Sequence, residues 1–314
     1  MSAQAAAPDR ALRQPGRRRS RSSRRSATDR RLGYALVAPV VILLLAVSAY
    51  PLVYNLWNSF HHDNLSVVGA HSFAGGSNYS KMVTSSEWLH ALERTAGFTV
   101  VSVVIETVAA VALALMLNAK FRGRGVLRAA ILVPWAVPTV VSATLWKTMF
   151  DPRQGFVDYV LGGLHLPGAH TTWLAGTWTS WVAIFVADAW KNVPFVAIIL
   201  LAGLQVIPTE IYEAARMDGA TTMQMFRRLT LPLLRPALMV ALIFRTLQAF
   251  LVFDVVYIMT GGGPGTSTET LSYLNWETFL VRTDFGYGGA ISVGLVVIAL
   301  IIAAGYVRVL RTEV

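Results

Sequence analysis

Few side chains in this sequence could do chemistry, and most of them interrupt long apolar runs. These polar interruptions are Glu106, Asp188, Lys191, Asn192, Arg245, Gln248 and Asp254. Ionisable groups at membrane depth are costly and are functional by default. They could offer directional hydrogen bonds to a polar ligand. They could equally form an ion-pair network that holds helices together, such as Asp188 with Lys191 or Arg245. Both interpretations stay open for each residue, except that Glu106 and Lys147 fit the structural role better.

The sequence contains no recognisable catalytic or metal-binding motif. Without cysteine it can form no disulfide, thiolate metal site or cysteine nucleophile. His61, His62 and His71 lack ligand spacing and are expected to be solvated loop residues. The chain carries no G-x-x-x-x-G-K-[ST] phosphate loop, no H-E-x-x-H and no G-x-S-x-G. We therefore expect neither an enzyme nor a cofactor bound by this chain.

Composition identifies the elements that must position these groups. The 314 residues are 54% hydrophobic and 14% charged, with a mean hydropathy of +0.52, whereas soluble domains carry about 25% charged residues. Runs of about 20 apolar residues can cross a bilayer as helices. The candidate spans lie near 33–57, 96–118, 127–149, 178–204, 236–257 and 289–310. The sequence therefore predicts an all-α membrane protein with six transmembrane helices, some of them interrupted by proline.

Charge asymmetry sets the expected topology. Residues 1–31 contain ten arginines and two acids, and we expect a disordered cytoplasmic tail that touches anionic lipid, followed by the membrane domain, 32–314. Basic residues also gather in loops 119–126 and 205–235 and at the C-terminus, whereas loops 58–95, 150–177 and 258–288 hold few. The positive-inside rule then places both termini and loop 205–235 in the cytoplasm.

Loop 205–235 has its own pattern, Glu213-Ala214-Ala215 followed by Gly219 and then Leu231-Pro232. We expect a helix that begins with Thr209 as its N-cap and closes at a left-handed Gly219. Thr221 or Thr222 could cap a second short helix that ends before Pro232. A short helix pair with small residues on one side suits a socket on another protein.

This spacing resembles the cytoplasmic coupling loop of permease subunits of binding-protein-dependent ABC importers. The resemblance implies the type I importer permease fold, with ATP and Mg²⁺ held by separate ATPase subunits. The coupling residues that it implies are Glu213, Ala214, Ala215, Asp218, Gly219, Leu231 and Pro232.

Two further stretches resemble the maltose-type carbohydrate branch of that family. They are Leu132-Val133-Pro134-Trp135-Ala136-Val137-Pro138 and the Gly-rich 257–264, followed by 268–271. The chain is similar to six-span first permeases of two-permease pairs, and most of all to trehalose-type permeases of actinobacteria. The implied partners are a second permease, two ATPase subunits and an extracytoplasmic sugar-binding protein, assembled at the plasma membrane. The implied substrate-pathway residues are Asp188, Asn192, Phe195, Arg245, Gln248 and Val252.

The main alternative is a secondary transporter driven by an ion gradient. Its buried polar residues would act as relays, and it predicts inverted repeats or helices broken at mid-depth. No repeat is visible, and this alternative leaves the Glu213 loop unexplained.

Overall fold

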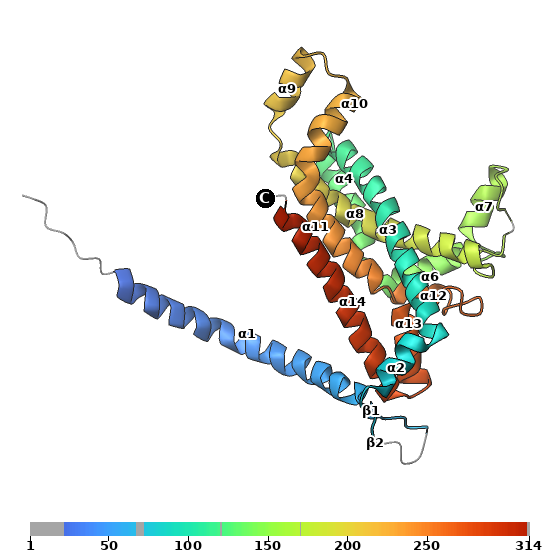
Figure 1. Ribbon diagram of the computed structural model, residues 1–314. Coiled ribbons are helices and arrows are strands. Elements are labelled where there is room, and N and C mark those ends of the chain that lie inside the picture. Colours follow the sequence, from blue (N-terminus) through green and yellow to red (C-terminus); the bar gives the residue numbers. More distant parts are fainter. Residues whose placement is uncertain (1–21, 67–71, 120, 170, 313–314) are drawn as a thin grey trace, which may run out of the picture. The chain divides into compact units, whose positions relative to one another are not determined.

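The computed structural model describes residues 22–66, 72–119, 121–169 and 171–312. These residues are almost entirely helical (Figure 1). The chain divides into two units, Met1–Tyr54 and Asn55–Val314, and each is described by itself. The expected tail residues 1–21, together with His71 and Lys120, lie outside the described residues.

The described part of the first unit is most of one long helix, α1 (Ser22–Ser59), whose apolar part is long enough to span a membrane. Pro39 and Pro51 lie inside this helix, as expected for a span that tolerates proline. The helix begins earlier than predicted, so residues 22–31 are helical and not disordered. Four of these ten residues are arginine, a good helix former, and an existing helix extends into such a segment at little cost.

The second unit is a helix bundle built around α3 (Ser86–Asn118), α8 (Thr177–Val206) and α11 (Leu231–Phe250). These three helices pack on one another, and α14 (Phe285–Thr312) packs against α11. Small and aliphatic side chains fill their interface, including Ala110, Ala114, Ala197 and Ala241. Small residues allow close helix approach in membranes. The close approach of α8 and α11 is clearest at Gly203, where an added Cβ would lie 2.5 Å from the Ala237 Cβ.

The predicted span near 127–149 is not one straight helix. It consists of α4 (Arg124–Ile131), α5 (Val133–Ala136) and α6 (Thr139–Met149), with a bend of 91° at the break. Pro138 causes the break, because it lacks an N–H and forces the preceding Val137 into an extended conformation. With the bent pair counted as one span, the described residues contain up to six candidate spans, and five without it.

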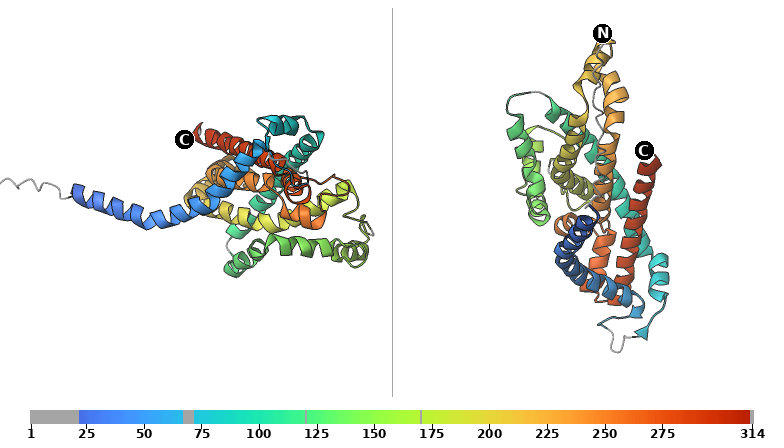
Figure 2. Two further views of the ribbon diagram at one scale, coloured as in Figure 1. Left: turned by 90° about the horizontal axis from the view of Figure 1, so that it is seen from below. Right: turned by 90° about the vertical axis from the view of Figure 1, so that its left-hand side faces the viewer.

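Loops separate to the two ends of the second unit (Figures 1 and 2). At one end lie α2 (Ser77–Thr84), the antiparallel strands β1 (His61–His62) and β2 (Ser72–Phe73), and α13 (Leu271–Trp276) with the π-helical turn η2 (Glu277–Val281). A bridge between Asn64 and Asp284 and an ion pair between Arg282 and Glu87 join the expected outer loops there. Helices α7 (Phe156–Gly163) and α12 (Asp254–Met259) follow α6 and α11 in the chain.

At the opposite end project α9 (Thr209–Met217) and α10 (Thr222–Met225), followed by the π-helical turn η1 (Phe226–Thr230). Two local expectations for this loop were wrong. The N-cap of α9 is Pro208, not Thr209. Pro232 does not stop the second helix, because η1 leads directly into α11 and places Pro232 in its first turn, where a missing N–H costs little.

Candidate functional site

A polar cavity of about 360 Å³ opens between α5, α6, α8, α11 and α12. This volume falls in the usual range of small-molecule sites. Its wall consists of Trp135, Thr139, Asp188, Lys191, Asn192, Arg245, Gln248, Leu251, Val252, Phe253, Asp254 and Val255. A larger cavity of about 540 Å³ on α6 has mostly aliphatic walls, and therefore offers fewer groups that could orient a polar ligand.

All but one of the residues proposed for a substrate pathway lie on the wall of the 360 Å³ cavity. The structure brings together Asp188 and Asn192 from α8 with Arg245 and Gln248 from α11, and adds Val252. Asp188 and Asn192 lie about one turn apart on α8 and therefore share a face of that helix. Arg245 and Gln248 do the same on α11.

Phe195 is the exception, because it stands behind the wall. Its ring stacks on Trp135, with centroids 4.8 Å apart and an interplanar angle of 9°, and contacts Phe244 on the other side. Phe195 therefore supports the Trp135 ring, and Trp135 is the aromatic side chain that lines the cavity. Thr139 and Phe253 were also not expected on the wall. For Trp135 the signal was present in the Pro134-Trp135 motif, but only the tertiary structure shows its position.

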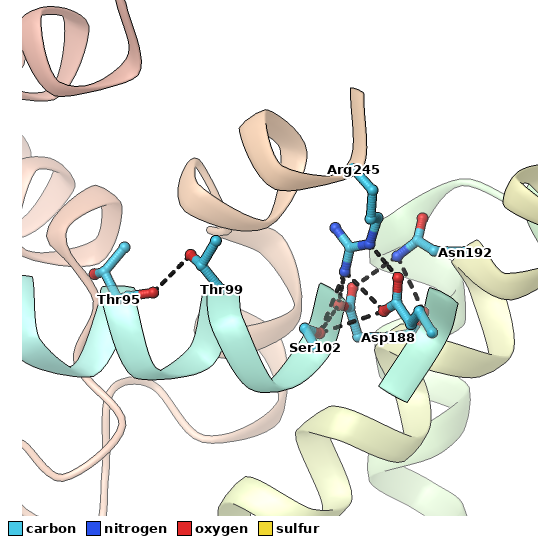
Figure 3. A network of polar contacts seen from close by, with 7 residues as sticks. Thr95, Thr99, Ser102, Asp188, Asn192 and Arg245 are labelled. Carbon is cyan, nitrogen blue, oxygen red and sulfur yellow. Dashed lines mark hydrogen bonds and ion pairs between the residues drawn. The ribbon is translucent and has the colours of Figure 1, made fainter. Parts of the chain in front are cut away.

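A buried ion cluster joins α3, α8 and α11 next to the cavity (Figure 3). Arg245 pairs with both Glu106 and Asp188. Its Nη2 also donates to the Ser102 hydroxyl at 3.3 Å, and Ser102 in turn donates to Asp188 Oδ2 at 2.9 Å. Glu106 is fully buried, and Arg245 is 3% exposed. One guanidinium thus serves two carboxylates that come from different helices.

The cluster shows which of the possible ion pairs forms. Asp188 pairs with Arg245 and accepts a hydrogen bond from the Asn192 amide at 2.8 Å. Lys191 instead donates from Nζ to the Val137 carbonyl at 2.6 Å and to the Trp135 carbonyl at 3.3 Å. Asp188 and Arg245 are therefore structural ion-pair partners and cavity-wall residues at the same time. Glu106 contacts Arg245 within the cluster and does not line the cavity.

Gln248 differs from its neighbours in the wall. It is exposed, and its side chain makes no hydrogen bond to any described residue. Its amide can both donate and accept, which suits a hydroxyl-bearing ligand. Asp254 is likewise exposed and makes no hydrogen bond to any described residue, so Gln248 and Asp254 are the polar wall residues most available to a ligand.

The Glu213 loop forms a tight helical hairpin at one end of the second unit. Gly219 adopts φ +77°, the left-handed conformation expected for the residue that closes α9. The Ala220 N–H donates to the Ala215 carbonyl at 2.9 Å, which completes this closure. Thr221 then caps α10 in a reciprocal capping box with Gln224, with bonds of 2.8 and 3.3 Å.

A single hydrogen bond between side chains, 3.1 Å between the hydroxyls of Tyr212 and Thr230, links α9 to η1. Otherwise the hairpin is uncovered. No α9 residue is buried, and Glu213, Ala214 and Asp218 are all exposed. Met217 is 88% exposed at the tip. Leu231 and Pro232 are exposed at the base, where α11 begins. A protruding hairpin that displays an apolar side chain is typical of a contact surface for another molecule.

Long apolar helices around a polar cavity, with a polar hairpin projecting from one end, are the architecture expected of a membrane-spanning transport subunit. Residues 106–311 match the family described as binding-protein-dependent transport system inner membrane component. The chain belongs to this family, and it is an integral membrane protein with several spans.

Individual relatives agree with this assignment. The chain is 39% identical over 283 residues to the trehalose/maltose transport system permease protein MalF of Thermococcus litoralis, a match covering 90% of this chain and 95% of the relative. It is 37% identical over 274 residues to the trehalose transport system permease protein SugA of Mycobacterium tuberculosis, a match covering 87% of this chain and 86% of the relative.

Solved structures confirm the fold. A chain of a bacterial ABC transporter involved in the import of the acidic polysaccharide alginate aligns with a TM-score of 0.78 at 22% identity, over 92% of this chain and 98% of that chain. A second alginate transporter structure, in complex with its periplasmic protein, aligns with a TM-score of 0.76 at 23% identity. The predicted ABC importer permease fold is therefore correct.

Proposed function

We propose that this chain is a permease subunit of an ATP-driven disaccharide importer, with trehalose as the first candidate substrate. The observation that carries the proposal is the polar, aromatic-edged cavity, which lies in the same chain as an uncovered coupling hairpin. The relatives named for trehalose and maltose transport support the choice of sugar.

The cavity offers the chemistry that sugar recognition needs. The Asn192 and Gln248 amides and the Asp188 carboxylate present donors and acceptors for hydroxyl groups. The Trp135 and Phe253 rings supply apolar faces against which the C–H side of a pyranose ring can pack. The wall carries two acidic side chains, Asp188 and Asp254, and two basic ones, Lys191 and Arg245, so its formal charges balance. This suits a neutral substrate better than an ionic one.

The energy must come from other polypeptides, since the sequence contains no phosphate-binding loop. We propose that ATPase subunits, which would hold ATP and Mg²⁺, bind the hairpin formed by α9 and α10. Glu213, Ala214, Asp218 and Gly219 would face the ATPase. Leu231 and Pro232 would pass its movement into α11, whose Arg245 and Gln248 border the cavity. A second permease subunit and an extracytoplasmic binding protein would complete the system.

Uptake of labelled trehalose by cells expressing the complete transport system tests the substrate proposal. Asn192→Ala and Gln248→Ala should lower uptake, each by roughly tenfold, because each removes hydrogen bonds to the sugar. Gln154→Ala, in an exposed loop outside the polar cavity, serves as the matched control and should transport normally. Normal uptake by both cavity variants would remove these residues from the substrate pathway.

The coupling proposal needs a separate test. Glu213→Lys and Gly219→Asp should abolish uptake while the protein still reaches the membrane in normal amounts. Uptake should also be vanadate-sensitive. Vanadate-insensitive uptake driven by a proton gradient would overturn ATP coupling and support the ion-gradient alternative.

A further inference from the structure

A second polar cavity, of about 440 Å³, lies at the same end of the second unit as the coupling hairpin. It is formed where α3 ends, α4 begins, α8 ends and α9 begins. Its polar wall residues are Asn118, Arg124, Arg128, Gln205, Thr209 and Tyr212. None of its lining residues is acidic, and the transport function proposed above does not use it.

Two arginines give this cavity its positive charge. Arg124 is exposed and makes no hydrogen bond or ion pair with any described residue. Arg128 is half-buried and donates from Nη2 to the Leu117 carbonyl at 3.0 Å. Its Nε is buried and finds no hydrogen-bond partner within the described part of the chain. Two guanidinium groups on one short helix, neither with a carboxylate partner in the part of the chain that the structure describes, are suited to binding an anion.

The start of α9 adds neutral donors to this charge. Its N-cap is Pro208, which provides no capping side chain, so the first backbone N–H groups of α9 remain open. Thr209 and Tyr212 from the same helix line the cavity. A helix N-terminus favours anions. Glu210, the nearest acid in sequence, is exposed and does not belong to the wall.

We propose that this cavity binds a phosphate group, held by Arg124 and Arg128 against the first turn of α9. Guanidinium groups match phosphate oxygens in bidentate geometry, and hydroxyl and amide donors complete the shell. Two sources can supply this chemistry, the headgroup of an anionic phospholipid or a soluble phosphate. Basic pockets at the cytoplasmic ends of membrane helices suit the former. In either case the bound group braces α9, and hence the hairpin, against the end of α3.

Thermal unfolding of the purified full chain in detergent tests the proposal. The first experiment compares the Tm in inorganic phosphate with the Tm in chloride at equal ionic strength. The other compares micelles containing short-chain phosphatidylglycerol with micelles containing phosphatidylcholine. At least one probe should raise Tm, and Arg124→Gln should weaken its apparent binding by roughly tenfold or more, as expected for hydrogen bonds to a charged group. Arg124 has no partner inside the described protein, so this substitution should leave the unliganded Tm unchanged.

Arg227→Gln is the matched control, because it removes one positive charge at the same end of the second unit from an exposed residue outside the cavity. It should retain the effect of the probe. Stabilisation by phosphatidylglycerol alone would assign the site to a lipid headgroup, and stabilisation by inorganic phosphate would assign it to a soluble phosphate. Stabilisation by neither probe, or an effect that Arg227→Gln loses equally, would overturn the site. Transport of sugar plays no part in this readout.

Discussion

Replacing Arg245 by methionine should destabilise the bundle more than any other single change in the buried ion cluster. The substitution keeps most of the side-chain volume but leaves Glu106 and Asp188 without their cation. Those residues are fully buried and 8% exposed, respectively. Removing one partner of a buried pair costs about 3–5 kcal/mol. At about 2 °C or more per kcal/mol, the Tm should fall by roughly 6 °C or more.

Glu106→Gln should cost much less, although Glu106 is the most buried member of the cluster. It leaves the pair between Arg245 and Asp188 intact, and the amide oxygen of glutamine still accepts from Arg245. We expect a loss of about 1–2 kcal/mol, the usual scale for a weakened hydrogen bond. The order of stability is therefore parent, Glu106→Gln and then Arg245→Met.

Thermal unfolding of the purified chain in detergent, followed by circular dichroism, measures this order. Gln248→Met is the control, since it changes a polar residue of α11 that makes no hydrogen bond within the described structure. It should unfold close to the parent. An Arg245→Met protein that unfolds within about 2 °C of the parent, or a Glu106→Gln protein that is the less stable of the two, would refute the reasoning.

Three further predictions concern other parts of the second unit. Gly219→Val should reduce ATP-dependent uptake far more than Gly219→Asn, because φ +77° costs a β-branched residue about 1–2 kcal/mol whereas asparagine tolerates it. Equal uptake by the two variants would argue against the left-handed closure. Gly203→Ala should lower stability by about 1–3 kcal/mol through overpacking against Ala237, while Gly97→Ala, with open space around it, should not. Burial, and then the charges of Glu277 and Glu87, raise the pKa of the Glu269 carboxyl from 4.5 to about 7, while Arg94 and Arg282 oppose this shift. The folded chain thus keeps a proton that the unfolded chain releases, so stability should fall as the pH rises from about 4.5 to about 7. Glu269→Gln should remove that dependence in unfolding measurements at several pH values.

Local chemistry made the structure of the Glu213 hairpin largely predictable. A left-handed closure at Gly219 and a cap at Thr221 depend on residues within a few positions of each other, and both are present. The role of Pro232 was not predictable in this way. Proline either stops a helix or begins one, and the choice depends on whether the preceding π-helical turn continues into α11.

Partners distant in the sequence were much harder to assign. Asp188 and Lys191 are close enough along α8 to pair, and the sequence offered Arg245 as an equal alternative. The fold places Arg245 beside Asp188 and directs Lys191 to the broken turn at Val137. The Trp135 and Val137 carbonyls are free to accept from Lys191 because the helix is interrupted there. This contact therefore depends on the bend that Pro138 causes in another segment.

The amino-acid sequence by itself determined that this is a polytopic membrane protein of the importer permease family, because hydropathy, charge bias and loop spacing are local properties of the chain. Together with the family resemblance, it also pointed to five of the twelve residues that line the cavity wall. Only the tertiary structure decided that Phe195 supports the wall while Trp135 forms it, and that one arginine joins three helices. Those facts depend on how helices rotate and cross, which the packing of small residues between α3, α8 and α11 sets.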